Sequence, residues 1–222
     1  MYKIKEMYDL DHTIAKEYLE RFDYPWEALA DLKDYIIELG KTLPNDEYDK
    51  IGENVWIAKD AKVFPSAYIG GPAIIGHKAE LRHSCFIRES AIVGNGAVVG
   101  NSTELKNDIL FDDVQVPHYN YVGDSILGYK AHMGAGSITS NVKSDKTLVV
   151  INDRINGEKI ETGRKKVGAM LGDNVEVGCN SVLNPGTVIG RNSNIYPVSC
   201  VRGVIPENSI YKDAKNIVKK EK

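Results

Sequence analysis

His118 lies in the part of the chain that is richest in groups able to do acid–base chemistry. Residues 117–124 (PHYNYVGD) combine its imidazole with several polar and aromatic side chains. Arg88, Glu104 and Lys106 precede it at positions that the repeat described below places one or two coils earlier on the same stack. A histidine can take a proton from an attacking group, and neighbouring cations favour an anionic ligand. We therefore expect a general base at His118 beside a site for a negatively charged group.

A six-residue repeat that begins at Ile51 must position these side chains. An aliphatic residue recurs at every sixth position, ten times without adjustment, and the series then continues with two five-residue steps and one interruption. A helix would place residues six apart on different faces, so this period excludes a helical interpretation. The 21 positions are Ile51, Ile57, Val63, Ile69, Ile75, Leu81, Ile87, Val93, Val99, Leu105, Leu110, Val116, Val122, Leu127, Met133, Leu171, Val177, Leu183, Ile189, Ile195 and Val201.

The six-residue period predicts a parallel β-helix over residues 49–206. Each unit supplies one short strand and one corner, three units close a triangular coil, and coils stack at ~4.8 Å. The aliphatic side chain points into the prism, and a small residue such as Ala97 or Ser181 recurs four positions later, where the chain turns. One unit cannot bury its own apolar side, so the stacked neighbours must supply the core. The general rule for crossovers would make this coil right-handed.

The segments on either side of the repeat have a different character. Residues 11–22 and 26–39 carry apolar residues at helical spacing, and Gly40 is a typical residue for ending the second helix. We expect residues 1–48 to form a helical hairpin that caps one end of the solenoid, because a repeat array needs its terminal core covered. The charged tail, residues 207–222, is predicted to end in a short helix.

The repeat is interrupted by an insertion at residues 142–168. Residues 147–152 and 158–162 flank Asn156 and Gly157, a strong signal for a hairpin turn. A basic run, Arg-Lys-Lys at 164–166, follows. Insertions in a solenoid usually lie on the functional face, although a surface decoration or a trimer contact would give the same pattern.

Composition narrows the functional classes. The formal net charge of −3 offers no basic excess for nucleic acid. No run of 18 apolar residues is present and the first residues do not resemble a signal peptide, so we expect no membrane span. Cys85, Cys179 and Cys200 lack metal-ligand spacing and read as reduced thiols of a cytoplasmic protein.

Three stretches resemble a known enzyme domain. Residues 100–107, 118–124 and 134–141 are similar, without gaps and with both five-residue steps, to the acetyltransferase domain of the bifunctional N-acetylglucosamine-1-phosphate uridyltransferase/glucosamine-1-phosphate acetyltransferase. With the later coils the resemblance covers about two thirds of the chain. It extends to proteins related to the uridyltransferase (pyrophosphorylase) of that enzyme, which carry the same basic hairpin. It implies a left-handed β-helix, a homotrimer with its cleft between subunits, and acetyl-CoA as co-substrate.

The resemblance also implies roles for single residues. His118 would take a proton from the amino group of a hexosamine phosphate or nucleotide amino sugar, and the amine would attack the thioester of acetyl-CoA. The backbone N–H of Ala135 would stabilise the developing oxyanion. The implied substrate-binding residues are Arg88, Lys106, Tyr121, His132 and Asn141, and the implied cofactor-binding residues are Ala135, Lys165, Lys166, Cys179 and Pro197.

The chain departs from that pattern in three ways. Nothing near its beginning offers the Gly-rich nucleotide loop of the pyrophosphorylase, His132 replaces the sugar-binding asparagine, and Pro117 replaces a glycine. The acceptor therefore stays open, oxygen acceptors included.

Two other classes of protein stay open at this point. One is a non-catalytic scaffold, or a sugar-nucleotide- or CoA-binding subunit that works with a separate enzyme. The other is a zinc carbonic anhydrase, which shares the fold but needs three converging histidines. His77 and His83 lie in successive hexads and project from different sides, so we expect no metal.

Overall fold

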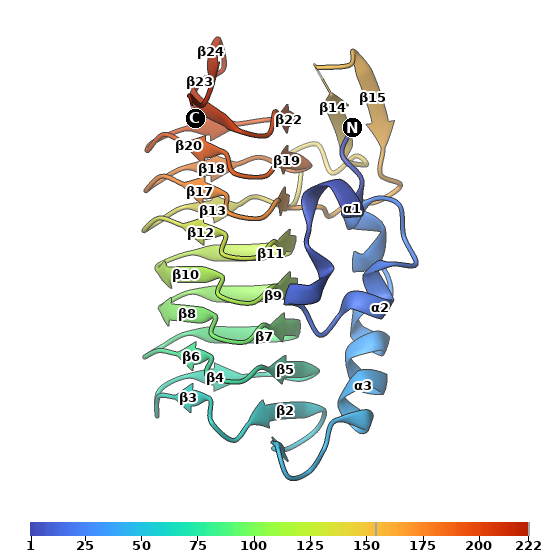
Figure 1. Ribbon diagram of the computed structural model, residues 1–222, viewed down its shortest axis with the longest axis vertical. Coiled ribbons are helices and arrows are strands. Elements are labelled where there is room, and N and C mark those ends of the chain that lie inside the picture. Colours follow the sequence, from blue (N-terminus) through green and yellow to red (C-terminus); the bar gives the residue numbers. More distant parts are fainter. Residues whose placement is uncertain (154, 222) are drawn as a thin grey trace.

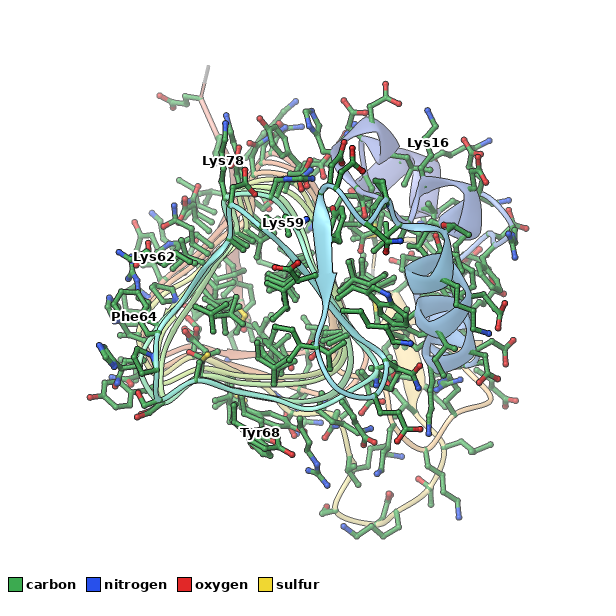
Figure 2. The ribbon with its side chains drawn as sticks, turned by 90° about the horizontal axis from the view of Figure 1, so that it is seen from below. Lys16, Lys59, Lys62, Phe64, Tyr68 and Lys78 are labelled. Atoms are coloured by element: carbon green, nitrogen blue, oxygen red, sulfur yellow. The ribbon has the colours of Figure 1, made fainter. Side chains whose placement is uncertain are left out.

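The computed structural model describes residues 1–153 and 155–221, and most of them form a left-handed parallel β-helix (Figure 1). Seen from below, the stacked coils outline a triangular prism with three faces (Figure 2). The first face holds β4 (Tyr68–Ile69), the first halves of β7 (Phe86–Val93), β9 (Glu104–Leu110) and β11 (Tyr121–Leu127), then β13 (Ile138–Thr139), β18 (Val182–Leu183) and β21 (Cys200–Val201). The predicted fold class is thereby confirmed.

The other two faces follow in the same way. The second face holds β2 (Val55–Ala58), β5 (Ala73–Ile75), the second halves of β7, β9 and β11, then β16 (Ala169–Leu171), β19 (Thr187–Ile189) and β22 (Val204–Ile205). The third holds β3 (Lys62–Val63), β6 (Glu80–Leu81), β8 (Val98–Asn101), β10 (Gln115–His118), β12 (His132–Met133), β17 (Glu176–Val177), β20 (Asn194–Ile195) and β23 (Ser209–Asp213).

The aliphatic repeat fills the prism. From Ile75 to Val201 every repeat position is at most 3% exposed. Ile51 is 55% exposed because it lies outside the solenoid. It directly follows β1 (Tyr48–Lys50), a strand that pairs antiparallel with β2. Val63 is 38% exposed because it belongs to the first coil, which no coil covers from below.

The N-terminal segment lies along the flank of the solenoid (Figure 1), so the predicted end cap is wrong. The 26–39 stretch divides into a 3-10 helix and a longer α-helix, while 11–22 forms only two single-turn helices. The elements are α1 (Ile4–Met7), η1 (Leu10–His12), α2 (Lys16–Leu19), η2 (Pro25–Leu29) and α3 (Leu32–Thr42). Contacts between α3 and both β5 and β7, and between η2 and β11, fix it to the second face.

An apolar column on the outside of the second face explains this placement. Successive strand residues point to opposite sides, so the residue before each interior aliphatic points outward. From β5 to β19 those outward residues are also apolar and at most 1% exposed: Ile74, Ile92, Ile109, Ile126, Met170 and Val188. Leaving such a column in water would cost roughly 1.5–3 kcal/mol per side chain. The N-terminal segment packs against strands β5, β7 and β11 of this column and so lies along the flank instead of over the end.

The two five-residue steps and the insertion all fall at the corner between the first and second faces. At each step one residue with positive φ, Asn107 (60°) or Asp124 (49°), turns the strand through the corner. One coil later the insertion leaves at this same corner, and the N–H of Gly168 donates to the carbonyl of Asp124 at 2.8 Å. The predicted hairpin is present as antiparallel β14 (Val150–Asp153) and β15 (Glu158–Glu161).

The C-terminal tail forms a strand pair, so the predicted short helix is wrong. β23 extends the third face beside β20, and β24 (Asn216–Lys219) pairs antiparallel with it. The side chain of Tyr211 is only 4% exposed, because this strand adds one more layer to the stack. Within the described residues, no helix is long and apolar enough to cross a membrane.

Candidate functional site

Polar side chains of three successive coils meet on the first face. In β9 and β11 the residues flanking the interior Leu105 and Val122 point outward, which brings Glu104 next to Tyr121 and Lys106 next to Gly123. Arg88 comes from the coil below, and its Nη1 lies 3.4 Å from Oε1 of Glu104. The structure therefore places Arg88, Lys106 and Tyr121 on one surface.

Asp124 ties this surface together. Its side chain is 2% exposed, and its carboxylate lies 3.3 Å from Nζ of Lys106. The carboxylate also accepts hydrogen bonds from Nδ2 of Asn107 at 2.9 Å and from Nδ2 of Asn141 at 2.6 Å. Nδ2 of Asn141 also donates to the hydroxyl oxygen of Tyr121 at 3.2 Å. One buried carboxylate thus positions Lys106 and Asn141 together.

A second buried carboxylate stiffens the backbone behind this surface. Asp108 is fully buried and accepts the N–H of Lys106 at 2.6 Å and the N–H of Ser125 at 2.9 Å. Burial raises the pKa of Asp108 well above its ordinary range, although the hydrogen bonds from these two backbone amides act against the rise. Burial likewise raises the pKa of Tyr121.

Neither aspartate was assigned a role from the sequence. Asp124 stands within the 118–124 motif, but a motif does not show which side chains an aspartate contacts. The sequence does contain one signal for them: each five-residue step carries a polar residue. At these steps the repeat is one residue short, and the strand turns the corner there.

His118 lies at the opposite edge of the first face, at the corner shared with the third face. Its backbone N–H donates to Oδ1 of Asn120 at 3.1 Å. Asn120 is buried and donates through Nδ2 to the carbonyls of Gly134 (2.9 Å) and Ser137 (3.0 Å). The imidazole is exposed and has no hydrogen-bond partner in the part of the chain that the structure describes. The backbone is held firmly while the ring remains accessible.

Three residues expected to contact the cofactor follow His118 along that corner. The N–H of Gly136 donates to the carbonyl of His118, that of Asn180 to Ala135, and that of Val198 to Cys179. Ala135, Cys179 and Pro197 therefore lie on successive coils above the histidine. A Cβ on Gly134 would come within 2.7 Å of the backbone nitrogen of Cys179, so only glycine permits this close stacking.

His132 does not join the first face. It begins β12 on the third face, where it stacks on Gln115 and its Nδ1 lies 2.7 Å from Oε2 of Glu176. This position separates it from the Lys106–Asp124 cluster by the width of a face. The partner of His132 is a carboxylate on its own face.

Lys165 and Lys166 lie away from Ala135 and Cys179, in an open cleft at the first–second corner. We name it the helix–hairpin cleft; its volume is about 540 Å³. The N-terminal segment and the arm that follows β15 form its walls. The charged residues that line it are Lys33, Glu89, Lys106, Asp124, Arg164, Lys165 and Lys166.

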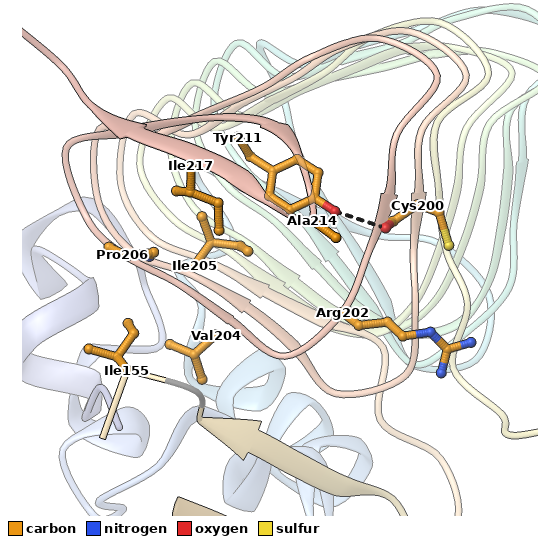
Figure 3. A pocket seen from close by; sticks show the side chains of 9 residues that line it. All are labelled: Ile155, Cys200, Arg202, Val204, Ile205, Pro206, Tyr211, Ala214 and Ile217. Carbon is orange, nitrogen blue, oxygen red and sulfur yellow. Dashed lines mark hydrogen bonds between the residues drawn. The ribbon is translucent and has the colours of Figure 1, made fainter. Parts of the chain in front are cut away.

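Two further observations limit the chemistry elsewhere. Among residues 1–153 and 155–221, no three His, Cys, Asp or Glu side chains gather in a group able to hold a metal ion. A smaller hollow of about 220 Å³ lies at the upper end, between the tip of the insertion and the last strands (Figure 3). Tyr211 donates from its hydroxyl to the carbonyl of Cys200 there, at 3.1 Å. The lining contains neither a histidine nor a carboxylate.

Comparison with known proteins supports the resemblance drawn from the sequence. The family model of the GMPPB C-terminal domain matches residues 69–167. A bifunctional sugar-1-phosphate nucleotidylyltransferase/acetyltransferase of Sulfurisphaera tokodaii is 33% identical over 111 residues, which cover 50% of this chain and 27% of that protein. The bifunctional protein GlmU of Methanococcus vannielii is 38% identical over 121 residues, covering 54% and 28%. The chain thus spans little more than a quarter of the length of these relatives.

Among solved structures, the UDP-N-acetylglucosamine acyltransferase of Francisella novicida is similar in fold to this chain. It is 13% identical with a TM-score of 0.48, and the match covers 74% of this chain and 65% of that one. At this level the likeness bears on neither substrate nor mechanism.

Proposed function

We propose that this hexapeptide-repeat chain, similar over half its length to bifunctional nucleotidyltransferase/acetyltransferases, transfers an acetyl group from acetyl-CoA to the amino group of a phosphorylated sugar. One observation carries the proposal. An accessible histidine lies at the edge of a face on which Arg88, Lys106, Tyr121 and Asn141 converge. These are a proton acceptor, two cations for an anionic group, and two neutral polar groups for hydroxyls.

Each group has a defined part in the reaction. Arg88 and Lys106 hold the phosphate, while Tyr121 and Asn141 orient the sugar. His118 takes a proton from the amine as the nitrogen forms a bond to the thioester carbon. The tetrahedral intermediate then collapses, the C–S bond breaks, and the sulfur of coenzyme A leaves with a proton.

The corner that carries His118, Ala135, Cys179 and Pro197 would supply the contacts of the acyl donor. The N–H of Ala135 donates no hydrogen bond within the described residues and is therefore available to the developing oxyanion. Cys179 and Pro197 would flank the pantetheine arm above it. Lys165 and Lys166 lie in the helix–hairpin cleft, at the opposite edge of the face from this corner, and are left out of the acyl donor's contacts.

We further propose a cytoplasmic homotrimer with this corner at a subunit contact. Tyr119 and Val198, on the corner beside His118 and Cys179, are 64% and 79% exposed. They lie three coils apart on one edge, and apolar side chains exposed beside a site are typical of a surface that a partner covers. Sedimentation equilibrium showing only monomers at working concentration would contradict the trimer.

The test compares two histidines on the same corner. His83 lies two coils below His118, as shown by the N–H of Ser102 donating to its carbonyl and that of Tyr119 donating to Asn101. Acetyl-CoA consumption is measured by mass spectrometry against a panel of amino sugar phosphates, nucleotide amino sugars and hydroxyl acceptors. We expect His118→Ala to lower kcat by ~10²-fold or more and His83→Ala to leave it nearly unchanged.

The same experiment separates the alternatives. Turnover by wild type that survives His118→Ala would remove the histidine from the mechanism. If no acceptor is turned over but calorimetry detects binding of acetyl-CoA, the protein would be a CoA-binding subunit and not an enzyme.

A further inference from the structure

Three segments far apart in the sequence meet at the helix–hairpin cleft. The carbonyl of Leu29, at the end of η2, accepts a hydrogen bond from Nδ2 of Asn107 at 3.3 Å. It also accepts one from Nη2 of Arg164 at 3.2 Å. The N-terminal segment, the corner of β9 and the arm of the insertion are thus joined at one atom. The cleft is a built feature of the subunit and does not depend on a second copy.

The cleft carries an excess of positive charge. Five cationic residues line it, against two carboxylates, Glu89 and Asp124. Asp124 is already engaged by Lys106, Asn107 and Asn141. Within residues 1–153 and 155–221, Lys33, Lys165 and Lys166 form no ion pair. Clustered cations without counter-charges repel one another, so an anion bound among them stabilises the arrangement.

Arg164 adds an independent observation. Its Nε is buried and has no hydrogen-bond partner, which holds for no other buried side-chain nitrogen or oxygen among the described residues. A buried donor without an acceptor is unfavourable, and the guanidinium fork fits phosphate oxygens closely. Because Arg164 lines the cleft, an oxygen of a phosphate bound there would supply the missing acceptor.

Lys106 connects the cleft to the first face, because it lines the cleft and is paired with Asp124, whose other partner Asn141 donates to Tyr121. A ligand whose first phosphate is held by Lys106 can therefore place a second phosphate near Arg164 and Lys33. We propose that the cleft binds this second phosphate, so that the acceptor is a nucleoside-diphosphate amino sugar and not a sugar 1-phosphate. The sugar part of this inference rests on the proposed function; the diphosphate part rests on the cleft alone.

The test uses pyrophosphate and inorganic phosphate as probes that need no knowledge of the nucleoside. Titration calorimetry at constant ionic strength compares wild type, Arg164→Gln, the double variant Lys33→Gln/Lys165→Gln, and Lys62→Gln as a control on the third face. We expect wild type and the control to bind pyrophosphate at least ~10-fold more tightly than phosphate, and both cleft variants to lose that preference.

The double variant leaves the Arg164–Leu29 hydrogen bond intact, so it reports on charge even if Arg164→Gln loosens the N-terminal segment. Equal affinity for the two probes in wild type, or an unchanged preference in the double variant, would overturn the inference.

Activity separates this inference from the proposed function. A preference for pyrophosphate without acetyl-CoA turnover supports the cleft and refutes the acetyltransferase. Turnover of a hexosamine 1-phosphate that equals turnover of every nucleoside-diphosphate amino sugar refutes the cleft and leaves the acetyltransferase standing.

Discussion

Replacing Asp124 by asparagine tests how the site is held together. The carboxylate is 2% exposed and faces the ammonium of Lys106, whose side chain is 14% exposed. Asparagine removes the charge and turns an NH₂ group toward one of the two amide donors, Asn107 or Asn141. Removing one partner of a buried ion pair costs ~3–5 kcal/mol. Since Lys106 can reach water, we expect a loss of ~3 kcal/mol in the free energy of unfolding.

A double-mutant cycle isolates the ion pair from these other contacts. Lys106→Met removes the ammonium while both amide hydrogen bonds to Asp124 remain, for a loss of ~2 kcal/mol. With both changes neither charge is left unpaired, so the combined loss should fall short of the sum by ~2 kcal/mol. Urea unfolding followed by circular dichroism measures the four proteins.

The more exposed pair Glu80 and Arg82 serves as a matched control. Its Nε and Oε1 atoms are 3.1 Å apart, closer than in the buried pair, but its side chains are 29% and 36% exposed. We expect a coupling below ~0.5 kcal/mol there, because water screens it. If the Asp124–Lys106 cycle also gave less than ~0.5 kcal/mol, the corner would not be held by this charge pair and our account of the site would fail.

Two further predictions concern burial. Burial raises the pKa of Cys85 to about 11, so a thiol reagent at pH 8 should modify only Cys179 and Cys200 in the native protein and the third thiol after denaturation; three thiols reacting at one rate would contradict this. Ile92→Ala, on the outside of the second face, should lower the free energy of unfolding by ~2–5 kcal/mol and make residues 1–48 more sensitive to proteolysis than the rest of the chain. Ile87→Ala, in the interior, should not make residues 1–48 selectively sensitive.

Local signals in the sequence were sufficient for the solenoid and the hairpin insertion. Side chains alternate between the two sides of a strand, so the residue of each hexad that points into the prism can be identified from those six residues alone. The turn at Asn156 and Gly157 is equally local. The two wrong predictions, the end cap and the C-terminal helix, both concern segments whose partners are distant. A polar helix-like tail and an amphipathic segment do not reveal the surface on which they pack.

The site shows the same division. The types of the residues and their hexad positions indicated a stack bearing Arg88, Glu104 and Lys106, because positions one coil apart stack, and the resemblance added Tyr121. Only the tertiary structure revealed that both five-residue steps and the insertion share one corner, and that Asp124 joins Lys106 to Asn141 there.

The sequence by itself therefore determined the repeat, its inside and its outside, because a single strand decides which side chains are buried in the prism. Only the tertiary structure decided what covers the outside. The apolar column on the second face recurs at intervals of 17 and 18 residues between Ile74 and Ile126, one coil at a time, and becomes a surface only when the coils stack. That surface drew residues 1–48 to the flank, and with them Leu29 and Lys33 to the cleft.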